Sequence, residues 1–201
     1  MVFLDLGTVG KYTSNLRLDC SQGICQAIDH LDGLGHKDFA FIAGPQTVRS
    51  AISRQAAFVN ALRQRGLETH RILEGNHQVD GGIRAVQALL AQRPLPTAIL
   101  CSNDITAIGA LHALQHAGIR VSQDVSVVGF DNIDLAAFTA PPLTTISVSR
   151  QLLGQLAVQA LEKILKSKRR MGVEYVLETE LVVRQSTAAP GKERTTSFPK
   201  P

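Results

Sequence analysis

Residues 97–131 read TAILCSNDITAIGALHALQHAGIRVSQDVSVVGFD, and this stretch decides the fold. Two short apolar runs, 97–101 and 125–130, enclose a longer segment with apolar residues at helical spacing: Ile105, Ile108, Leu111 and Leu114. Short apolar runs are typical of buried strands, and the wider spacing is typical of a helix. Gly118 is a suitable residue to end that helix. The stretch therefore predicts a strand, a helix and a second strand in succession.

The same alternation continues along the rest of the chain. Further strands are predicted at residues 2–4, 39–43, 71–73, 145–148 and 175–183. Further helices are predicted at residues 20–34, 52–62, 82–91 and 152–166. Strands that alternate with helices of about 10–15 residues indicate a parallel sheet with helices on both faces. The expected fold class is therefore α/β, with an irregular loop at 131–142 and a disordered tail at 189–201.

Composition limits the classes of function. The 201 residues suffice for one large domain or two small lobes, and the formal net charge of +4 is a mild excess. Aromatic residues make up 4% with no Trp, so stacking platforms for single-stranded nucleic acid are scarce. Basic residues at 168–170 and in the tail favour a solvated surface over a nucleic-acid clamp.

The cysteines and the N-terminus bear on location. The sequence has three cysteines, Cys20, Cys25 and Cys101, and none of them has CxxC spacing. This odd number without the motif argues against a disulfide framework or a zinc module, and it fits a reducing cytoplasm. No basic region or cleavage site marks a secretory signal. No apolar run approaches the roughly 20 residues needed to span a bilayer. We expect a cytoplasmic protein without a membrane partner.

Four loops follow predicted strands and carry polar groups: 44–50, 74–79, 102–104 and 131–134. Open parallel sheets bind ligands beyond the carboxyl ends of their strands, so these loops are the candidate site. In 44–50, a helix N-terminus and Arg49 could bind an anion or a hydroxyl-rich ligand, although a plain exposed loop is the favoured reading. His77 could contact a ligand or be an ordinary surface histidine.

The carboxylates after two strands raise the question of catalysis. The sequences Ser-Asn-Asp at 102–104 and Asp-Asn-Ile-Asp at 131–134 could supply acid–base groups, helix caps or acceptors for ligand hydroxyls. No GxSxG or HExxH motif accompanies them, so we expect no enzyme activity. His112 and His116 have metal-binding spacing, but without a recognisable third ligand a polar helix face is favoured. No metal and no cofactor are predicted.

A set of motifs gives a more specific indication. They are His30-Leu31, Leu34-Gly35-His36-Lys37, Phe41-Ile42-Ala43-Gly44-Pro45, Pro96-Thr97-Ala98-Ile99, Asn103-Asp104, residues 107–111 (AIGAL), residues 124–131 (DVSVVGFD), residues 142–146 (PLTTI) and residues 183–187 (VRQST). Their order and spacing resemble the LacI/GalR family of bacterial transcription regulators. The resemblance covers about residues 1–188. It implies a periplasmic-binding-protein-like fold of type I, with two α/β lobes and a cleft crossed by three chain segments.

The resemblance also implies functions for particular residues. Members of this family are usually homodimeric repressors whose affinity for operator DNA changes when a small effector, often a sugar or a nucleobase, binds in the cleft. The residues that match effector-contacting positions are Asp131, Asn103, Asp104, His77, Arg49, Ser50 and Asp5. A sugar or sugar derivative is the favoured effector. One departure is Cys20, which stands where the family commonly has Asn.

The resemblance divides residues 1–188, the expected effector-binding domain, into a complete and a partial lobe. Residues 20–147 and 176–188 form the expected complete C-terminal lobe, and residues 1–17 and 148–173 a partial N-terminal lobe. The family's helix-turn-helix would precede this sequence and is expected to be absent, so operator DNA would be bound only through that missing part. The alternatives are a sugar-binding protein of a transport system and, less favoured, a hydrolase or isomerase.

Overall fold

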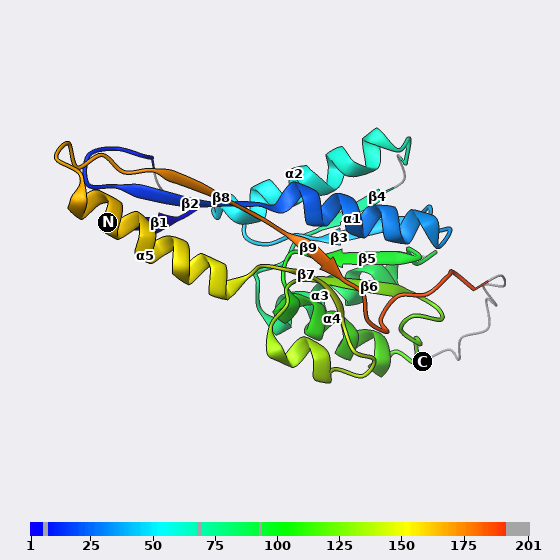
Figure 1. Ribbon diagram of the computed structural model, residues 1–201. Coiled ribbons are helices and arrows are strands. Elements are labelled where there is room, and N and C mark those ends of the chain that lie inside the picture. Colours follow the sequence, from blue (N-terminus) through cyan, green and yellow to red (C-terminus); the bar gives the residue numbers. More distant parts are fainter. Residues whose placement is uncertain (6–7, 68–69, 93, 192–201) are drawn as a thin grey trace.

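The computed structural model describes residues 1–5, 8–67, 70–92 and 94–191 and contains two sheets (Figure 1). The larger sheet has the order β4-β3-β5-β6-β7-β9. Its strands are β3 (Phe39–Ile42), β4 (His70–Leu73), β5 (Ala98–Cys101), β6 (Ser126–Asp131), β7 (Thr144–Ser147) and β9 (Glu180–Val182). All neighbouring pairs are parallel except β7 and β9, which are antiparallel. The predicted parallel α/β sheet is therefore confirmed.

Helices cover both faces of this sheet, because successive strand residues point to opposite sides. Helices α1 (Cys20–Gly33) and α2 (Arg49–Gln64) lie on one face, and α3 (Val79–Ala91) and α4 (Asp104–His116) lie on the other (Figure 1). In β3, Phe39 and Phe41 pack into the core under α1 and α2, whereas Ala40 and Ile42 pack into the core under α3 and α4. The continuous apolar runs of the sequence thus supply two cores at once.

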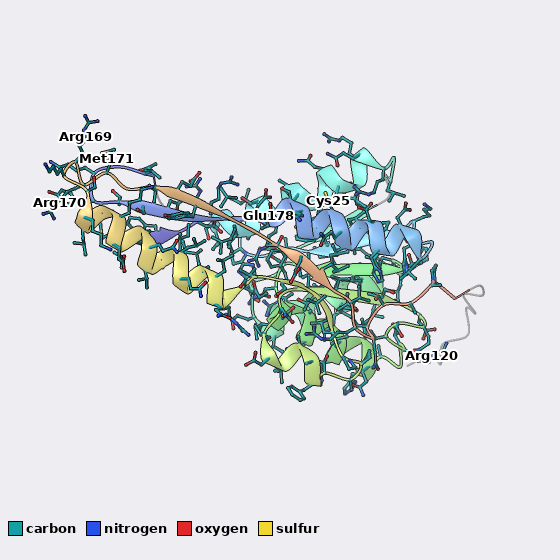
Figure 2. The ribbon with its side chains drawn as sticks, viewed as in Figure 1. Cys25, Arg120, Arg169, Arg170, Met171 and Glu178 are labelled. Carbon is teal, nitrogen blue, oxygen red and sulfur yellow. The ribbon has the colours of Figure 1, made fainter. Side chains whose placement is uncertain are left out.

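The smaller sheet consists of three parallel strands in the order β1-β2-β8. They are β1 (Val2–Leu4), β2 (Ser14–Asp19) and β8 (Glu174–Glu178), and helix α5 (Arg150–Lys166) packs beside them. Figure 1 shows this unit extending from one end of the larger sheet. In α5 only Ala160 and Ile164 are buried. Figure 2 places the basic Arg169 and Arg170 at the far tip of this unit.

Two predictions for the smaller sheet were wrong. Residues 175–183 do not form one strand, because β8 and β9 belong to different sheets and Thr179 lies between them. Strand β2 was not predicted, because the charged residues at 17 and 19 interrupt its apolar character. The loop at 131–142 also contains a short 3-10 helix, η1 (Asp134–Phe138). The predicted tail lies outside the described residues from 192 onward, and 189–191 belong to no helix or strand.

Three connections join the two units of the fold. Strand β2 runs directly into α1, β7 leads to α5, and β8 leads to β9 (Figure 1). Pairing with β2 places β8 in the smaller unit, so we keep the two-lobe division as a proposal with 174–178 assigned to the smaller lobe. In the described part of the chain, no helix has both the length and the apolar character needed to cross a membrane.

Candidate ligand-binding site

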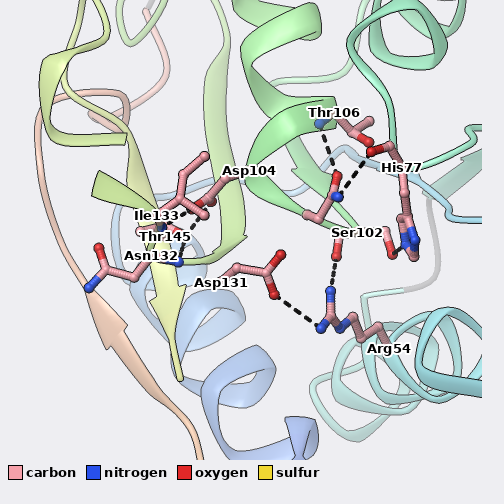
Figure 3. Close-up of polar contacts among 10 residues, drawn as sticks. Arg54, His77, Ser102, Asp104, Thr106, Asp131, Asn132, Ile133 and Thr145 are labelled. Carbon is pink, nitrogen blue, oxygen red and sulfur yellow. Dashed lines mark hydrogen bonds and ion pairs between the residues drawn. The ribbon is translucent and has the colours of Figure 1, made fainter. Parts of the chain in front are cut away.

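Arg54 lies at the centre of a polar cluster beyond the carboxyl ends of the strands (Figure 3). It projects from α2, and its side chain is only 9% exposed. One guanidinium nitrogen donates to the Ser102 carbonyl at 2.5 Å, and another donates to Asp131 Oδ1 at 3.2 Å. The guanidinium carbon lies 3.8 Å from the centroid of the Phe130 ring. Arg54 therefore joins the ends of β5 and β6 while keeping a cationic group at this edge of the sheet.

Sequence reasoning missed Arg54, although a signal was present. The helix begins at Arg49, three residues earlier than predicted. Its buried face is formed by Ala51, Arg54, Ala57, Phe58, Ala61 and Leu62. Arginine on such an apolar stripe is rarely buried unless it has partners, so a charge at this spacing was the available indication of a site.

Asp131 is the last residue of β6, and its carboxylate is 36% exposed. Its backbone φ is 114°, a conformation that residues with a Cβ atom rarely adopt. Burial raises the pKa of Asp131, and the positive charge of Arg54 opposes that rise. The strained backbone thus directs a partly exposed carboxylate, paired with Arg54, into the polar cluster. Backbone strain of this kind is typical of functional sites.

His77 and Asn103 lie beside Arg54, on the loops after β4 and β5. His77 Nε2 lies 2.9 Å from Ser102 Oγ, and the Asn103 amide donates to the His77 carbonyl at 3.2 Å. Gly44 allows the His77 ring to lie against the loop after β3, because a Cβ atom there would lie 1.9 Å from Nε2. Burial, and secondly the charge of Arg54, lower the pKa of His77, so its imidazole is neutral at pH 7.

Asp104 is placed differently from the other predicted site residues. It is the first residue of α4, it has 0% exposure, and its carboxylate accepts hydrogen bonds from Ile133 N–H and the Thr145 hydroxyl. Its carboxylate is therefore not exposed to solvent in this conformation. The expectation that Asp104 lines the cleft is therefore not supported by its placement, and the carboxylate lies behind the loop that bears Asp131.

Asp5, Arg49 and Ser50 meet at a cavity of about 260 Å³ between the smaller sheet and the start of α2. Arg54 also lines this cavity, so it borders both groups of predicted residues. The other charged lining residues are Arg17, Asp19 and Glu174. Asp5 has a φ of 52°, and its carboxylate accepts the Leu18 N–H at 2.9 Å. The structure thus brings six of the seven predicted residues to one end of the large sheet, around an arginine that was not predicted.

The side chains that could ligate a metal ion are spread over the fold. Within residues 1–5, 8–67, 70–92 and 94–191, no three His, Cys, Asp or Glu side chains gather closely enough to hold a metal ion. His112 and His116 are exposed, with ring centroids 6.1 Å apart, on α4. Cys20, Cys25 and Cys101 are all free thiols.

The parallel sheet with helices on both faces is the fold of a known domain family. The model of that family, described as a periplasmic binding protein-like domain, matches residues 28–187. The chain therefore belongs to the periplasmic binding protein-like domain family.

The similar proteins are LacI-type repressors. The chain is 36% identical over 188 residues to the HTH-type transcriptional repressor PurR of Pasteurella multocida, a match that covers 92% of this chain and 56% of that protein. The chain thus spans little more than half the length of this relative.

Solved structures of LacI-type regulators have the same fold as this chain. A dimeric lac repressor superposes with a TM-score of 0.85 at 32% identity, covering 94% of this chain and 69% of that one. A LacI family regulator from Enterococcus faecium with bound ribose gives a TM-score of 0.84 at 27% identity, with coverage of 94% and 70%. These likenesses confirm the fold and the family expected from the motifs.

Proposed function

We propose that this chain is the effector-binding part of a LacI-type transcriptional repressor and that its ligand is a small polyhydroxylated molecule, a sugar or sugar derivative. The observation that carries the proposal is the Arg54–Asp131 pair at the carboxyl edge of the sheet, with Asp131 held partly exposed on a strained backbone. A carboxylate accepts hydrogen bonds from two ligand hydroxyls while the neighbouring guanidinium donates to a third oxygen.

The surrounding residues fit the same ligand class. His77 and Asn103 add polar atoms at the rim, and Asp5, Arg49 and Ser50 offer contacts from the side of the smaller sheet. The carboxylate, guanidinium, imidazole and amide groups of the cluster suit hydrogen-bonded recognition of such a ligand, and the relatives are repressors, so the function we propose is not enzymatic. The ribose in the Enterococcus faecium relative supports a sugar as ligand.

The partners follow from the same proposal. The relatives are repressors, one of them a dimer, so we propose a homodimer in the cytoplasm that controls an operator through a helix-turn-helix outside these residues. A ligand would act by binding one arrangement of the two units more tightly than another, which shifts the population between them.

The test is calorimetric titration of the chain with ribose, cellobiose and purine bases. We expect saturable binding of a sugar, and Asp131→Asn should weaken it by about tenfold or more, since a hydrogen bond to a charged group contributes about 1.5–3 kcal/mol. Asp29→Asn is the matched control, because that carboxylate pairs with Arg65 on the surface of α1. Equal sugar affinity in Asp131→Asn and the unaltered chain would contradict the proposed site.

A further inference from the structure

Asp104 is a fully buried carboxylate that lies beside Thr145 and Ile133, close to the segment that bears Asp131 (Figure 3). Burying a carboxylate is unfavourable unless its oxygen atoms are fully hydrogen-bonded. Both oxygens of Asp104 have partners, and both partners hold the segment that follows Asp131. This arrangement suggests that Asp104 acts on the site through that segment.

Asp104 and Thr145 accept hydrogen bonds from two successive backbone N–H groups. Ile133 N–H donates to Asp104 Oδ2 at 2.9 Å. Asn132 N–H donates to the Thr145 hydroxyl oxygen at 3.4 Å, and that hydroxyl donates to Asp104 Oδ1 at 2.5 Å. The pair formed by Asp104 and Thr145 therefore holds the backbone just after the ligand-bearing carboxylate.

The backbone at this point needs such support. Asp131 and Asn132 have φ values of 114° and 51°, and two consecutive residues with Cβ atoms in the left-handed region are unfavourable on their own. A conformation of this kind persists only where surrounding contacts fix it. The Asn132 side chain is also held, by Arg184 at 2.7 Å and Ser147 at 3.2 Å, but Asp104 and Thr145 are the partners of the backbone N–H groups. Without those two partners we expect the backbone to loosen and the Asp131 carboxylate to move from its place beside Arg54.

The approach of Asp104 to this segment depends on Gly129 in β6. A Cβ atom at that position would lie 2.1 Å from Asp104 Oδ1 and 2.9 Å from Leu143 Cδ2. Glycine at this position therefore allows the Asp104 carboxylate to pack directly against the backbone of β6.

We propose that Asp104 and Thr145 are positioning residues that hold the Asp131–Asn132 backbone in the left-handed conformation and so aim Asp131 at the ligand and at Arg54. The inference rests on the proposed function for its ligand, whereas the positioning itself is a property of the free chain. It assigns a binding role to a hydroxyl and a carboxylate that do not contact the ligand.

The test uses Thr145→Val, which removes the hydroxyl with little change in volume and no change in charge. Thr145→Ser restores the hydroxyl. Thr97→Val is the control, because Thr97 lies just before β5, at the opposite end of that strand from the polar cluster, and its hydroxyl donates to the Asp38 carbonyl at 2.9 Å. Two NMR measurements on the free chain report positioning: amide hydrogen exchange at Asn132 and Ile133, and the pH titration of the Asp131 carboxyl carbon.

We expect about tenfold faster exchange at both amides in Thr145→Val, the change that corresponds to losing a charge-assisted hydrogen bond. We also expect the Asp131 pKa to fall toward its ordinary range as the carboxylate leaves its buried position. Thr145→Ser should restore both signals, and Thr97→Val should leave both unchanged. Unchanged exchange and an unchanged Asp131 titration in Thr145→Val would overturn the proposal.

Titration with ribose separates this inference from the proposed function. If the unaltered chain binds ribose and Thr145→Val binds it about tenfold more weakly, with Thr97→Val unaffected, the positioning role extends to ligand binding. Equal ribose affinity in Thr145→Val and the unaltered chain would overturn that role. If the unaltered chain does not bind ribose, the ligand class is wrong, and the two NMR signals still decide whether Asp104 and Thr145 position Asp131.

Discussion

Asp104 carries its carboxyl group where water does not reach, and its protonation is therefore coupled to folding. Burial raises the pKa of Asp104 to about 6, with the negative charge of Asp131 adding to the rise and the hydrogen bonds from Thr145 and Ile133, together with Arg184, opposing it. The unfolded chain has an ordinary aspartate with a pKa of about 3.9. Between these two values the folded protein binds more protons than the unfolded one.

The first prediction concerns the pH dependence of stability. Because the folded pKa is the higher one, the stability linked to Asp104 is complete below about pH 4 and is lost as the pH rises through about 6. The shift of about two units corresponds to roughly 3 kcal/mol at pH 7. Asp104→Asn should remove this loss, which is measured as the difference in free energy of unfolding between variant and unaltered chain from pH 4 to 7.

The comparison between the two proteins removes the contributions of titrating groups that do not interact with Asp104. Burial also lowers the pKa of His36, which costs stability as the pH falls below about 6.5, the ordinary histidine value. Both proteins contain His36, so its contribution cancels in the difference. If the difference in free energy of unfolding between the two proteins stayed constant from pH 4 to 7, Asp104 would be ionised to the same extent in the folded and unfolded chain.

The second prediction tests the space beside Asp104. Gly129→Ala places a methyl group 2.1 Å from Asp104 Oδ1, so the carboxylate or the strand must move. We expect a loss of about 1–3 kcal/mol in the free energy of unfolding, the usual cost of overpacking. Gly154→Ala in α5 meets nothing within 4 Å and should be neutral or stabilising by up to about 1 kcal/mol. Equal effects of the two substitutions would contradict this view of the packing.

Among the helices and strands, α4 begins at a residue that also belongs to the candidate site. Asn103 is its N-cap, and its side-chain oxygen accepts Thr106 N–H at 2.9 Å, as the helix-start residues at 102–104 predict. The same side chain donates to the His77 carbonyl. One residue therefore begins a helix and connects the loops after β4 and β5.

The third prediction follows from this cap. Asn103→Ala should lower the free energy of unfolding by about 1 kcal/mol, because a helix N–H loses its acceptor. Gln78→Ala is the control, since Gln78 holds the equivalent position before α3 without a side-chain cap hydrogen bond. Chemical denaturation measures both. A cost for Gln78→Ala as large as that for Asn103→Ala would mean that the cap hydrogen bond is not what stabilises α4.

In the molecule as a whole, Thr179 fixes the place where the chain passes from the smaller sheet to the larger one. It is 1% exposed, its hydroxyl donates to the Asp19 carbonyl at 2.8 Å, and its oxygen accepts Gly23 N–H at 3.1 Å. The first partner ends β2 and the second lies in α1. Two of the three connections between the units therefore meet at one side chain.

The fourth prediction is that Thr179→Val destabilises the chain, because it removes the hydrogen bonds to the part-buried Asp19 carbonyl and to the buried Gly23 N–H. The expected cost is about 1–3 kcal/mol in the free energy of unfolding, measured by urea denaturation. Thr179→Ser keeps the hydroxyl and should retain most of the stability. A change within about 0.5 kcal/mol for Thr179→Val, the usual range for surface substitutions, would show that the connections do not depend on this contact.

The sequence by itself determined the α/β class, the five parallel strands of the large sheet and the loops of the candidate site. Apolar periodicity, caps and glycines act over a few residues, so 97–131 indicated its strands and helix without the rest of the chain. Tertiary structure decided what depends on distant residues. Arg54 meets Asp131 across 77 positions, and β8 separates from β9 because its partner β2 belongs to another sheet. No local pattern encodes such pairings, because their energies come from packing and burial that exist only once the chain has folded.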